Sequence, residues 1–189
     1  MSMAASLPAF SGGPAPAAVV VMGVCGAGKT TVGLRLAAVL GATFVDGDDL
    51  HSPAARAKMA ASIALDDADR WAWLDRVGQQ LAAGVAQGEG TVIACSALRR
   101  AYRDRLRAAA GPALRLIYLQ AELDGVRARI AARTGHVVPA SLVESQFALL
   151  EPPYAEPDVI SMPFDADLSR ALPVLAARLT RPPIGRIEW

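Results

Sequence analysis

The most constraining feature of the sequence is a glycine-rich segment that connects an apolar run to a helical pattern. Residues 23–30 read G-V-C-G-A-G-K-T, after the apolar residues 18–22 and at the start of the helical pattern of residues 29–40. Glycines let consecutive backbone N–H groups turn toward one anion without a Cβ clash, and a helix start adds partial positive charge there. The spacing between a strand and a helix therefore predicts a phosphate-binding loop.

The loop residues have distinct expected roles. We expect the catalytic Lys29 to reach the outer phosphates of a nucleotide and the Thr30 hydroxyl to bind Mg²⁺. The alternative is a glycine-rich turn that matches by chance, but the chain has only two lysines, Lys29 and Lys58. A lysine at the required position is therefore informative. The predicted nucleotide contacts from this segment are Gly23, Gly26, Ala27, Gly28, Lys29, Thr30 and Thr31.

From residue 17 onward, short apolar runs alternate with longer helical patterns, which predicts an α/β domain over residues 17–180. The expected architecture has three layers: a five-stranded parallel sheet, helices on both faces, and a small lid at about residues 127–140. We expect residues 1–16 to be a disordered tail and residues 181–189 a C-terminal tail. The predicted strands are 18–22, 43–45, 91–95, 114–119 and 158–160. The predicted helices are 29–40, 53–60, 67–86, 98–109, 122–132, 141–149 and 168–179.

A carboxylate-rich segment, D-G-D-D-L-H, follows the second predicted strand at residues 46–51. In an open parallel sheet the carboxyl ends of the strands line the ligand crevice, so these carboxylates should face the phosphate loop. Phosphoryl transfer needs a held metal ion and a carboxylate that orients or deprotonates the attacking hydroxyl. We assign the second role to Asp48 and the metal contact to Asp46. An acidic surface turn is the alternative.

Three groups of basic residues could recognise anions. Ser52 and Pro53 have the pattern of a helix start, which places Arg56 and Lys58 beside His51 as predicted substrate contacts. Ser96 is expected to cap the helix that follows the third strand. The cations at that helix start cost about 0.3–1 kcal/mol each unless an anion lies nearby. Ser96, Arg99 and Arg103 are therefore further predicted substrate contacts. The alternative for both groups is a solvated surface, and for His51 a structural role.

The third group is Arg129 and Arg133, one helical turn apart and followed by Gly135. Two such arginines could clamp ATP, and one that closes over the transferring group would stabilise its charge and exclude water. Arg133 is therefore also a predicted catalytic residue. A salt-bridged surface helix is the alternative.

Composition limits the remaining classes of partner and location. The formal net charge is +1 and the pI is near 7.8, so no overall field favours nucleic acid or an acidic membrane. The two cysteines, Cys25 and Cys95, fit neither a metal-binding nor a disulfide-rich pattern, which favours a reducing, cytoplasmic location. Prolines and glycines interrupt the uncharged residues 1–28, so we expect neither an export signal nor a membrane span.

Several elements together strongly resemble the gluconokinase family over about residues 19–153. They are V-M-G-V-C-G-A-G-K at 21–29, D-G-D-D-L-H at 46–51, D-R-W-A-W-L at 69–74, C-S-A-L-R-R-A-Y-R-D at 95–104, and G-H at 135–136. The resemblance implies phosphorylation of gluconate by ATP, Mg²⁺ dependence, a fold like that of nucleoside monophosphate and shikimate kinases, and often a homodimer.

Carried residue by residue, the resemblance assigns the ATP loop to residues 23–30, the substrate-orienting acid to Asp48 and the lid arginine to Arg133. By similarity to related kinases Arg129 stacks on adenine, and His136 is a predicted substrate contact. The sequence departs from the family pattern at three positions, where members tend to have an acid, a proline and an aromatic residue: Ala68, Ala72 and Val137.

Rival interpretations remain at this point. One is a kinase for shikimate or another hydroxy acid. A second is a nucleotide-binding switch, although the chain has no guanine-reading N-K-x-D motif. A third is a nucleic-acid-end kinase, which the near-neutral charge and the lack of alternating aromatic and basic residues disfavour.

Overall fold

The computed structural model describes residues 18–61, 63, 65–132 and 139–179. It contains five strands in one parallel sheet of order β2-β3-β1-β4-β5. The strands are β1 (Ala18–Met22), β2 (Thr43–Asp46), β3 (Thr91–Ala94), β4 (Leu114–Gln120) and β5 (Val159–Pro163). The helices are α1 (Lys29–Leu40), α2 (Pro53–Ala60), α3 (Asp67–Gln87), α4 (Arg100–Ala110), α5 (Leu123–Ala131), α6 (Ala140–Leu149) and α7 (Leu168–Leu179), with short 3-10 turns η1 (Gly47–Leu50) and η2 (Gly111–Ala113).

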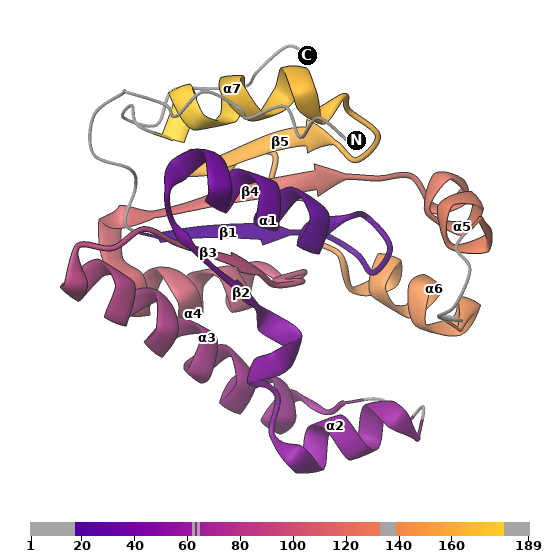
Figure 1. Cartoon of the computed structure of the whole chain (residues 1–189). Coiled ribbons are helices and arrows are strands. Elements are labelled where there is room, and N and C mark those ends of the chain that lie inside the picture. The colour runs from indigo at the N-terminus through magenta and orange to yellow at the C-terminus, as the bar shows by residue number, and fades with distance from the viewer. Residues whose placement is uncertain (1–17, 62, 64, 133–138, 180–189) are drawn as a thin grey trace, which may run out of the picture.

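The central strand β1 divides the core into two halves. All five of its residues are fully buried, because helices cover the sheet on both faces. Val19 and Val21 pack into a cluster with residues of α1 and α7, whereas Val20 and Met22 pack into a cluster with residues of α3 and α4. Figure 1 shows the same three layers, with α7 on one side of the sheet and α3 and α4 on the other. The predicted α/β architecture is confirmed.

Two element boundaries differ from the prediction by more than one residue. The fifth strand runs over Val159–Pro163 rather than 158–160, and α4 begins at Arg100 rather than at residue 98. The chain remains extended at Arg99, and Ala97 has a φ of 42°, a left-handed conformation that is unusual for alanine. The polypeptide therefore turns sharply after β3 before the helix can start.

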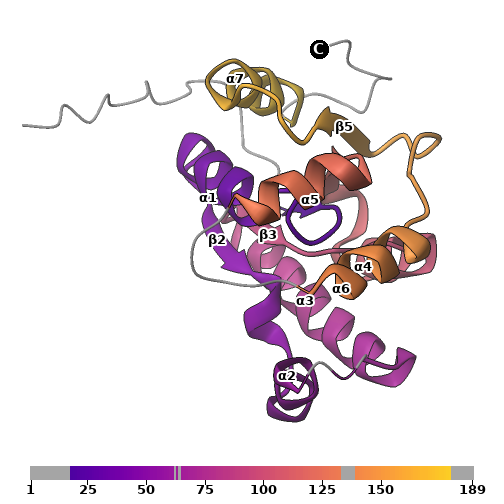
Figure 2. The same cartoon turned by 90° about the vertical axis from the view of Figure 1, so that its right-hand side faces the viewer.

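The carboxyl ends of the strands form the edge of the sheet that carries the phosphate loop. In Figure 2 this edge faces the viewer, and α5 and α6 flank the loop that joins β1 to α1. The predicted tails, and part of the lid predicted at about 127–140, lie outside the described residues. Within the described part of the chain, no helix is both long and apolar enough to cross a membrane.

Candidate active site

The phosphate loop joins β1 to α1, as predicted, and packs closely against α5. Gly26 has a φ of 82°, and a Cβ built on it would lie 2.9 Å from Cδ1 of Ile130 on α5. The backbone conformation at this position therefore favours glycine, and a side chain here would have to displace the end of the Ile130 side chain. The Lys29 side chain, which opens α1, folds back and donates from Nζ to the carbonyl oxygen of Val24 at 3.1 Å. The Lys29 side chain therefore lies against the phosphate loop.

A hydrogen-bond chain connects the phosphate loop to the acidic segment after β2. The Thr30 hydroxyl donates to Oδ2 of Asp46 at 2.9 Å, and Oδ1 of the same carboxylate accepts the backbone N–H of Asp48 at 3.1 Å. Asp46 thereby caps η1 and fixes the backbone of Asp48 relative to α1. A hydroxyl and a carboxylate oxygen are ligands that Mg²⁺ prefers, so these two side chains fit a magnesium ion. Among the described residues, no group of three or more acidic, histidine or cysteine side chains is placed to hold a metal ion.

Helix α3 fixes the acidic segment from the other side. Trp73 donates from Nε1 to the carbonyl oxygen of Gly47 at 2.6 Å, and Arg76 donates from Nε to that of Leu50 at 2.5 Å. A Cβ built on Gly47 would lie 2.4 Å from the carbonyl oxygen of Ala94, so only glycine lets the ends of β2 and β3 come this close. The position of Asp48 is therefore determined by three elements of the fold.

Asp48 lies in a strongly charged setting. The residue as a whole is exposed, yet protein surrounds its carboxyl group enough that desolvation raises the pKa above the ordinary value of 3.8. Lys29 opposes this change in pKa, whereas the carboxylates of Asp46 and Asp49 add to it. A carboxylate with a raised pKa, next to the phosphate-loop lysine, is suited to accept a proton from a hydroxyl group.

His51 is buried beneath the same segment. Its ring stacks on that of Trp73, with 4.5 Å between ring centroids and an interplanar angle of 9°. Only 7% of the residue is exposed, and its Nδ1 atom has no hydrogen-bond partner among the described residues. Burial and the nearby Arg76 lower its pKa to about 4, so the imidazole is neutral at physiological pH.

A recess adjoins the start of α1. Its volume is about 240 Å³, and it is lined by Ala27, Gly28, Thr31, Val32, Arg129, Phe164, Ala166 and Leu168. The Arg129 guanidinium lies over the Phe164 ring, 4.4 Å from its centroid, and donates to the carbonyl oxygens of Ala27 and Phe164. The recess therefore combines an apolar wall with a planar cation beside the phosphate loop.

The other accessible basic residues that were predicted to contact the substrate have partners within the protein. Lys58 pairs with Asp69 at 2.6 Å, and Arg99 pairs with Asp67 at 3.6 Å. Arg56 is exposed and donates to the carbonyl oxygen of Asp49. Ser52 caps α2 with its side chain, as predicted, and so places Arg56 and Lys58 on the helix that follows His51. An anionic substrate would have to compete with the aspartates for Lys58 and Arg99.

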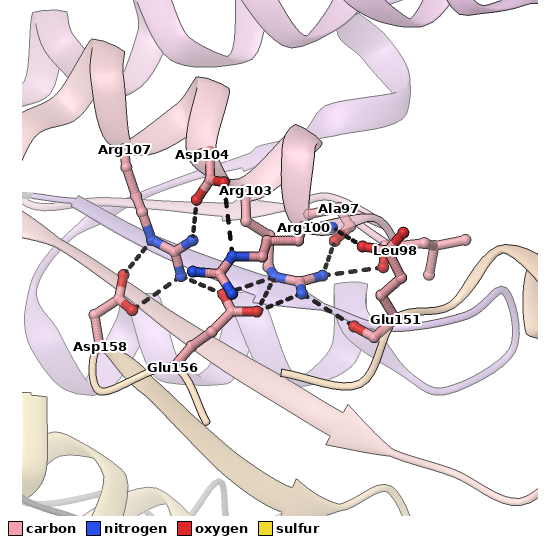
Figure 3. A network of polar contacts seen from close by, with 9 residues as sticks. All are labelled: Ala97, Leu98, Arg100, Arg103, Asp104, Arg107, Glu151, Glu156 and Asp158. Carbon is pink, nitrogen blue, oxygen red and sulfur yellow. Dashed lines mark hydrogen bonds and ion pairs between the residues drawn. The ribbon is translucent and has the colours of Figure 1, made fainter. Parts of the chain in front are cut away.

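The predicted substrate role of Arg103 does not fit its position. Arg103 is 1% exposed, and its guanidinium donates to Glu156 and to the carbonyl oxygens of Ala97, Leu98 and Glu151. Figure 3 shows it enclosed in what we call the α4 network: Arg103, Arg107, Glu156 and Asp158. The sequence pattern was correct in placing an anion near this helix, but the anions belong to the protein itself.

Ser96 was wrongly predicted to cap α4. The cap position is Arg99, which makes no side-chain cap, and Glu151 accepts the N–H of Arg100 at 2.6 Å instead. Ser96 contributes through its backbone, since its carbonyl oxygen accepts the N–H of Gly23 at 3.3 Å. Because Arg103 holds the next two carbonyls, the α4 network supports the turn that contacts the phosphate loop.

Two predicted site residues, Arg133 and His136, lie outside the described residues, as does Val137. Other residues were missed. Phe164 and Leu168 follow the last strand, and the rule that strand ends line the crevice could have indicated them. Trp73 was noticed only as part of a family element. Nothing in the sequence drew attention to Gln146, whose Oε1 accepts the N–H of Cys25 in the phosphate loop at 2.7 Å.

The fold and the site together define a class of protein. The glycine loop between β1 and α1, its lysine and threonine, the facing carboxylates and the adjacent recess form the arrangement of a P-loop kinase for small molecules. The sequence profile described as an AAA domain matches residues 19–153, which include the loop and the acidic segment.

Individual relatives specify the family. A probable gluconokinase from Mus musculus is 41% identical over 170 residues, which are 82% of this chain and 92% of the relative. A gluconokinase from Gluconobacter oxydans is 43% identical over 77% of this chain and 81% of its own. The crystal structure of a gluconokinase from Sinorhizobium meliloti superposes with a TM-score of 0.79 at 38% identity, covering 87% of this chain and 91% of that one. The chain belongs to the gluconokinase family.

Proposed function

We propose that this protein transfers the terminal phosphoryl group of ATP to the 6-hydroxyl of gluconate. The observation that carries the proposal is the hydrogen-bonded chain from Thr30 through Asp46 to the backbone of Asp48. It holds an acid with a raised pKa opposite the phosphate-loop lysine. Membership of the gluconokinase family supports gluconate as the acceptor.

The proposed roles follow from the chemistry at each group. The loop N–H groups and Lys29 bind the phosphates and balance the charge that spreads over the transferring group. Asp48 orients the sugar-acid hydroxyl and takes its proton as the new O–P bond forms, while the bond from the terminal phosphorus to the bridging oxygen breaks and ADP leaves. Arg129 and the apolar wall around Phe164 hold the adenine. Arg133 and His136, which the family resemblance adds, remain predictions.

Mg²⁺ is proposed as a further component, held by Thr30 and Asp46. When bound, the ion would neutralise charge on the phosphate oxygens. His51, Arg56, Lys58 and Arg99 are the proposed contacts of the sugar acid. The homodimer and the cytoplasmic location implied by the resemblance and the composition also stay predictions.

An ATP-consumption assay with a panel of acceptors tests the substrate. The panel contains gluconate, shikimate, other sugar acids and a neutral hexose, and ATP alone is the blank. We expect turnover with gluconate to exceed that with every other acceptor. Equal or faster turnover with shikimate or another hydroxy acid would remove gluconate as the substrate, and consumption without any acceptor would favour a nucleotide-hydrolysing switch.

The variant Asp48→Asn tests the proposed base. Asparagine keeps the shape but cannot take a proton, so we expect kcat to fall about 10²- to 10⁴-fold while the Kd for ATP changes little. The exposed Asp49→Asn is the matched control, since Asp49 is its neighbour and has no assigned role. Near-normal turnover by Asp48→Asn would deprive that residue of its role.

A further inference from the structure

One side chain from α6 reaches into the phosphate loop. Gln146 lies 121 positions after Cys25, yet its Oε1 accepts the Cys25 backbone N–H at 2.7 Å. Figure 2 shows α6 beside the loop that joins β1 and α1. Because a backbone N–H can only donate, the atom that faces it must be the amide oxygen, which fixes the orientation of the Gln146 amide.

The loop and the helix start use their N–H groups in three ways. The first N–H groups of α1, beginning at Lys29, have no partner within the helix and are the ordinary donors to phosphate oxygens. Ala27 donates within the loop, to the carbonyl oxygen of Val24 at 3.2 Å. Cys25, on the loop before Gly26, is instead held by a neighbouring helix. Gln146 thus lies at the rim of the phosphate site.

The nitrogen of the Gln146 amide can still donate hydrogen bonds to a ligand. Its two N–H donors make no hydrogen bond to any other described residue, although the residue is half-buried. A primary amide that is fixed by its oxygen presents its nitrogen in a set direction at little further cost in entropy. A fixed donor beside phosphate oxygens is the arrangement that stabilises charge as it develops in transfer.

We propose that Gln146 is a residue of the transfer site: its oxygen anchors to the phosphate loop and its N–H group donates to an oxygen of the transferring phosphoryl group. The inference deepens the proposed function in that it assumes transfer from ATP, but it does not depend on which acceptor is used. The ordinary alternative is a tether that only fastens α6 to the loop.

Two substitutions separate these roles. Gln146→Glu keeps an oxygen for the Cys25 N–H but replaces the donor with a negatively charged oxygen. Gln146→Met has similar length and lacks both groups. The matched control on the same helix is Ser145→Ala, because Ser145 is exposed and, among the described residues, its hydroxyl bonds only to the carbonyl oxygen of Leu142 within α6.

Each variant is assayed for kcat, for melting temperature, and for binding of ADP and of a non-hydrolysable ATP analogue. We expect both Gln146 variants to lose about 10- to 100-fold in kcat and to bind the ATP analogue less tightly, with ADP binding and melting temperature unchanged. Ser145→Ala should match the natural chain.

Three results would overturn the proposal: a normal rate in Gln146→Glu, an equal loss of affinity for ADP and the ATP analogue, or a loss of rate that merely follows a lower melting temperature. The binding experiment contains no acceptor. It therefore tests Gln146 even if gluconate proves not to be the substrate, and a failure there leaves the acceptor panel to decide the proposed function.

Discussion

The phosphate loop and the α4 network both concentrate strong hydrogen-bonding groups, and they use them in opposite ways. In the α4 network every donor of the Arg103 guanidinium is bonded to the protein, and Arg107 pairs with Asp104, Glu156 and Asp158. Burial alone would raise the pKa of Glu156, but the hydrogen bonds from the two arginines outweigh it and lower that pKa. At the phosphate loop, the helix-start N–H groups are left for a ligand.

Both regions carry a hollow, so shape alone does not distinguish them. The one over the α4 network, about 340 Å³, is lined by Arg100, Asp104, Arg107, Ala155, Glu156, Pro157 and Asp158, and no phosphate-loop residue borders it. The smaller one, about 240 Å³, borders the loop. What differs is whether the hydrogen-bonding groups already have protein partners: those of the α4 network do, whereas the first N–H groups of α1 have none within the helix. A satisfied cluster holds the fold, and an unsatisfied one can bind.

The largest effect on activity should follow from a change at the phosphate loop. We expect Lys29→Ala to lower kcat/KM by about a thousandfold, because it removes the cation that balances the transferring phosphate. The melting temperature should stay near that of the natural chain, since Lys29 is half-exposed and its only hydrogen bond among the described residues goes to the Val24 carbonyl. The measurement pairs steady-state kinetics with thermal unfolding. A fall in stability without loss of rate would show that Lys29 stabilises the fold and does not serve the transfer reaction.

Disrupting the α4 network should mainly lower the stability of the fold. Arg103→Met leaves three carbonyls without their donor and Glu156 with Arg107 alone, so the free energy of unfolding should fall by about 2–4 kcal/mol. Urea unfolding measures it. The control is Asp75→Ala, which removes the exposed pair with Arg105, whose side chains are 42% and 49% exposed, and should cost less than about 1 kcal/mol. Equal losses in the two variants would contradict the distinction between buried and surface pairs.

The smallest expected effect is a pH dependence of stability that arises from His51. This histidine is buried, as the α4 network is, but it lies under the acidic segment that faces the phosphate loop. Its pKa is about 4 when folded and 6.5 when free, so the unfolded chain takes up a proton that the folded chain resists. Stability should therefore decrease as the pH falls from about 6.5 toward 4. His51→Phe keeps a ring to stack on Trp73 but cannot titrate, and should gain about 1–3 kcal/mol relative to the natural chain over that range. If the stabilities of the two proteins change in parallel with pH, His51 is not the source of the pH dependence.

The sequence predicted the frame well because each of its signals is local. The apolar strand, the glycine spacing and the following helix lie within residues 18–40, and β1 and α1 have the predicted bounds. The cap at Ser52 was also correct, because a capping side chain acts within three residues. Strand ends were then enough to bring Asp46 and the phosphate loop together.

The prediction failed where the deciding partner is remote in the chain. Arg103 has the same sequence appearance as a surface arginine, and its burial depends on Glu156, which is 53 positions away. The start of α4 was misplaced for the same reason, since the anion at its N-terminus is Glu151. Gln146 carries no charge and no motif. Only the packing of α6 against the loop reveals its contact.

The fastening of the chain after α6 determines how that helix can move. The N–H of Glu151 donates to the Leu98 carbonyl at 2.9 Å, Arg103 donates to the Glu151 carbonyl, and the Glu151 carboxylate accepts the Arg100 N–H. This triple attachment holds the chain in place just after the C-terminal end of α6. A rotation of the helix about this point would therefore displace Leu149 least and Ala140 most. At Gln146, even a small rotation would move the side chain along the rim of the phosphate loop.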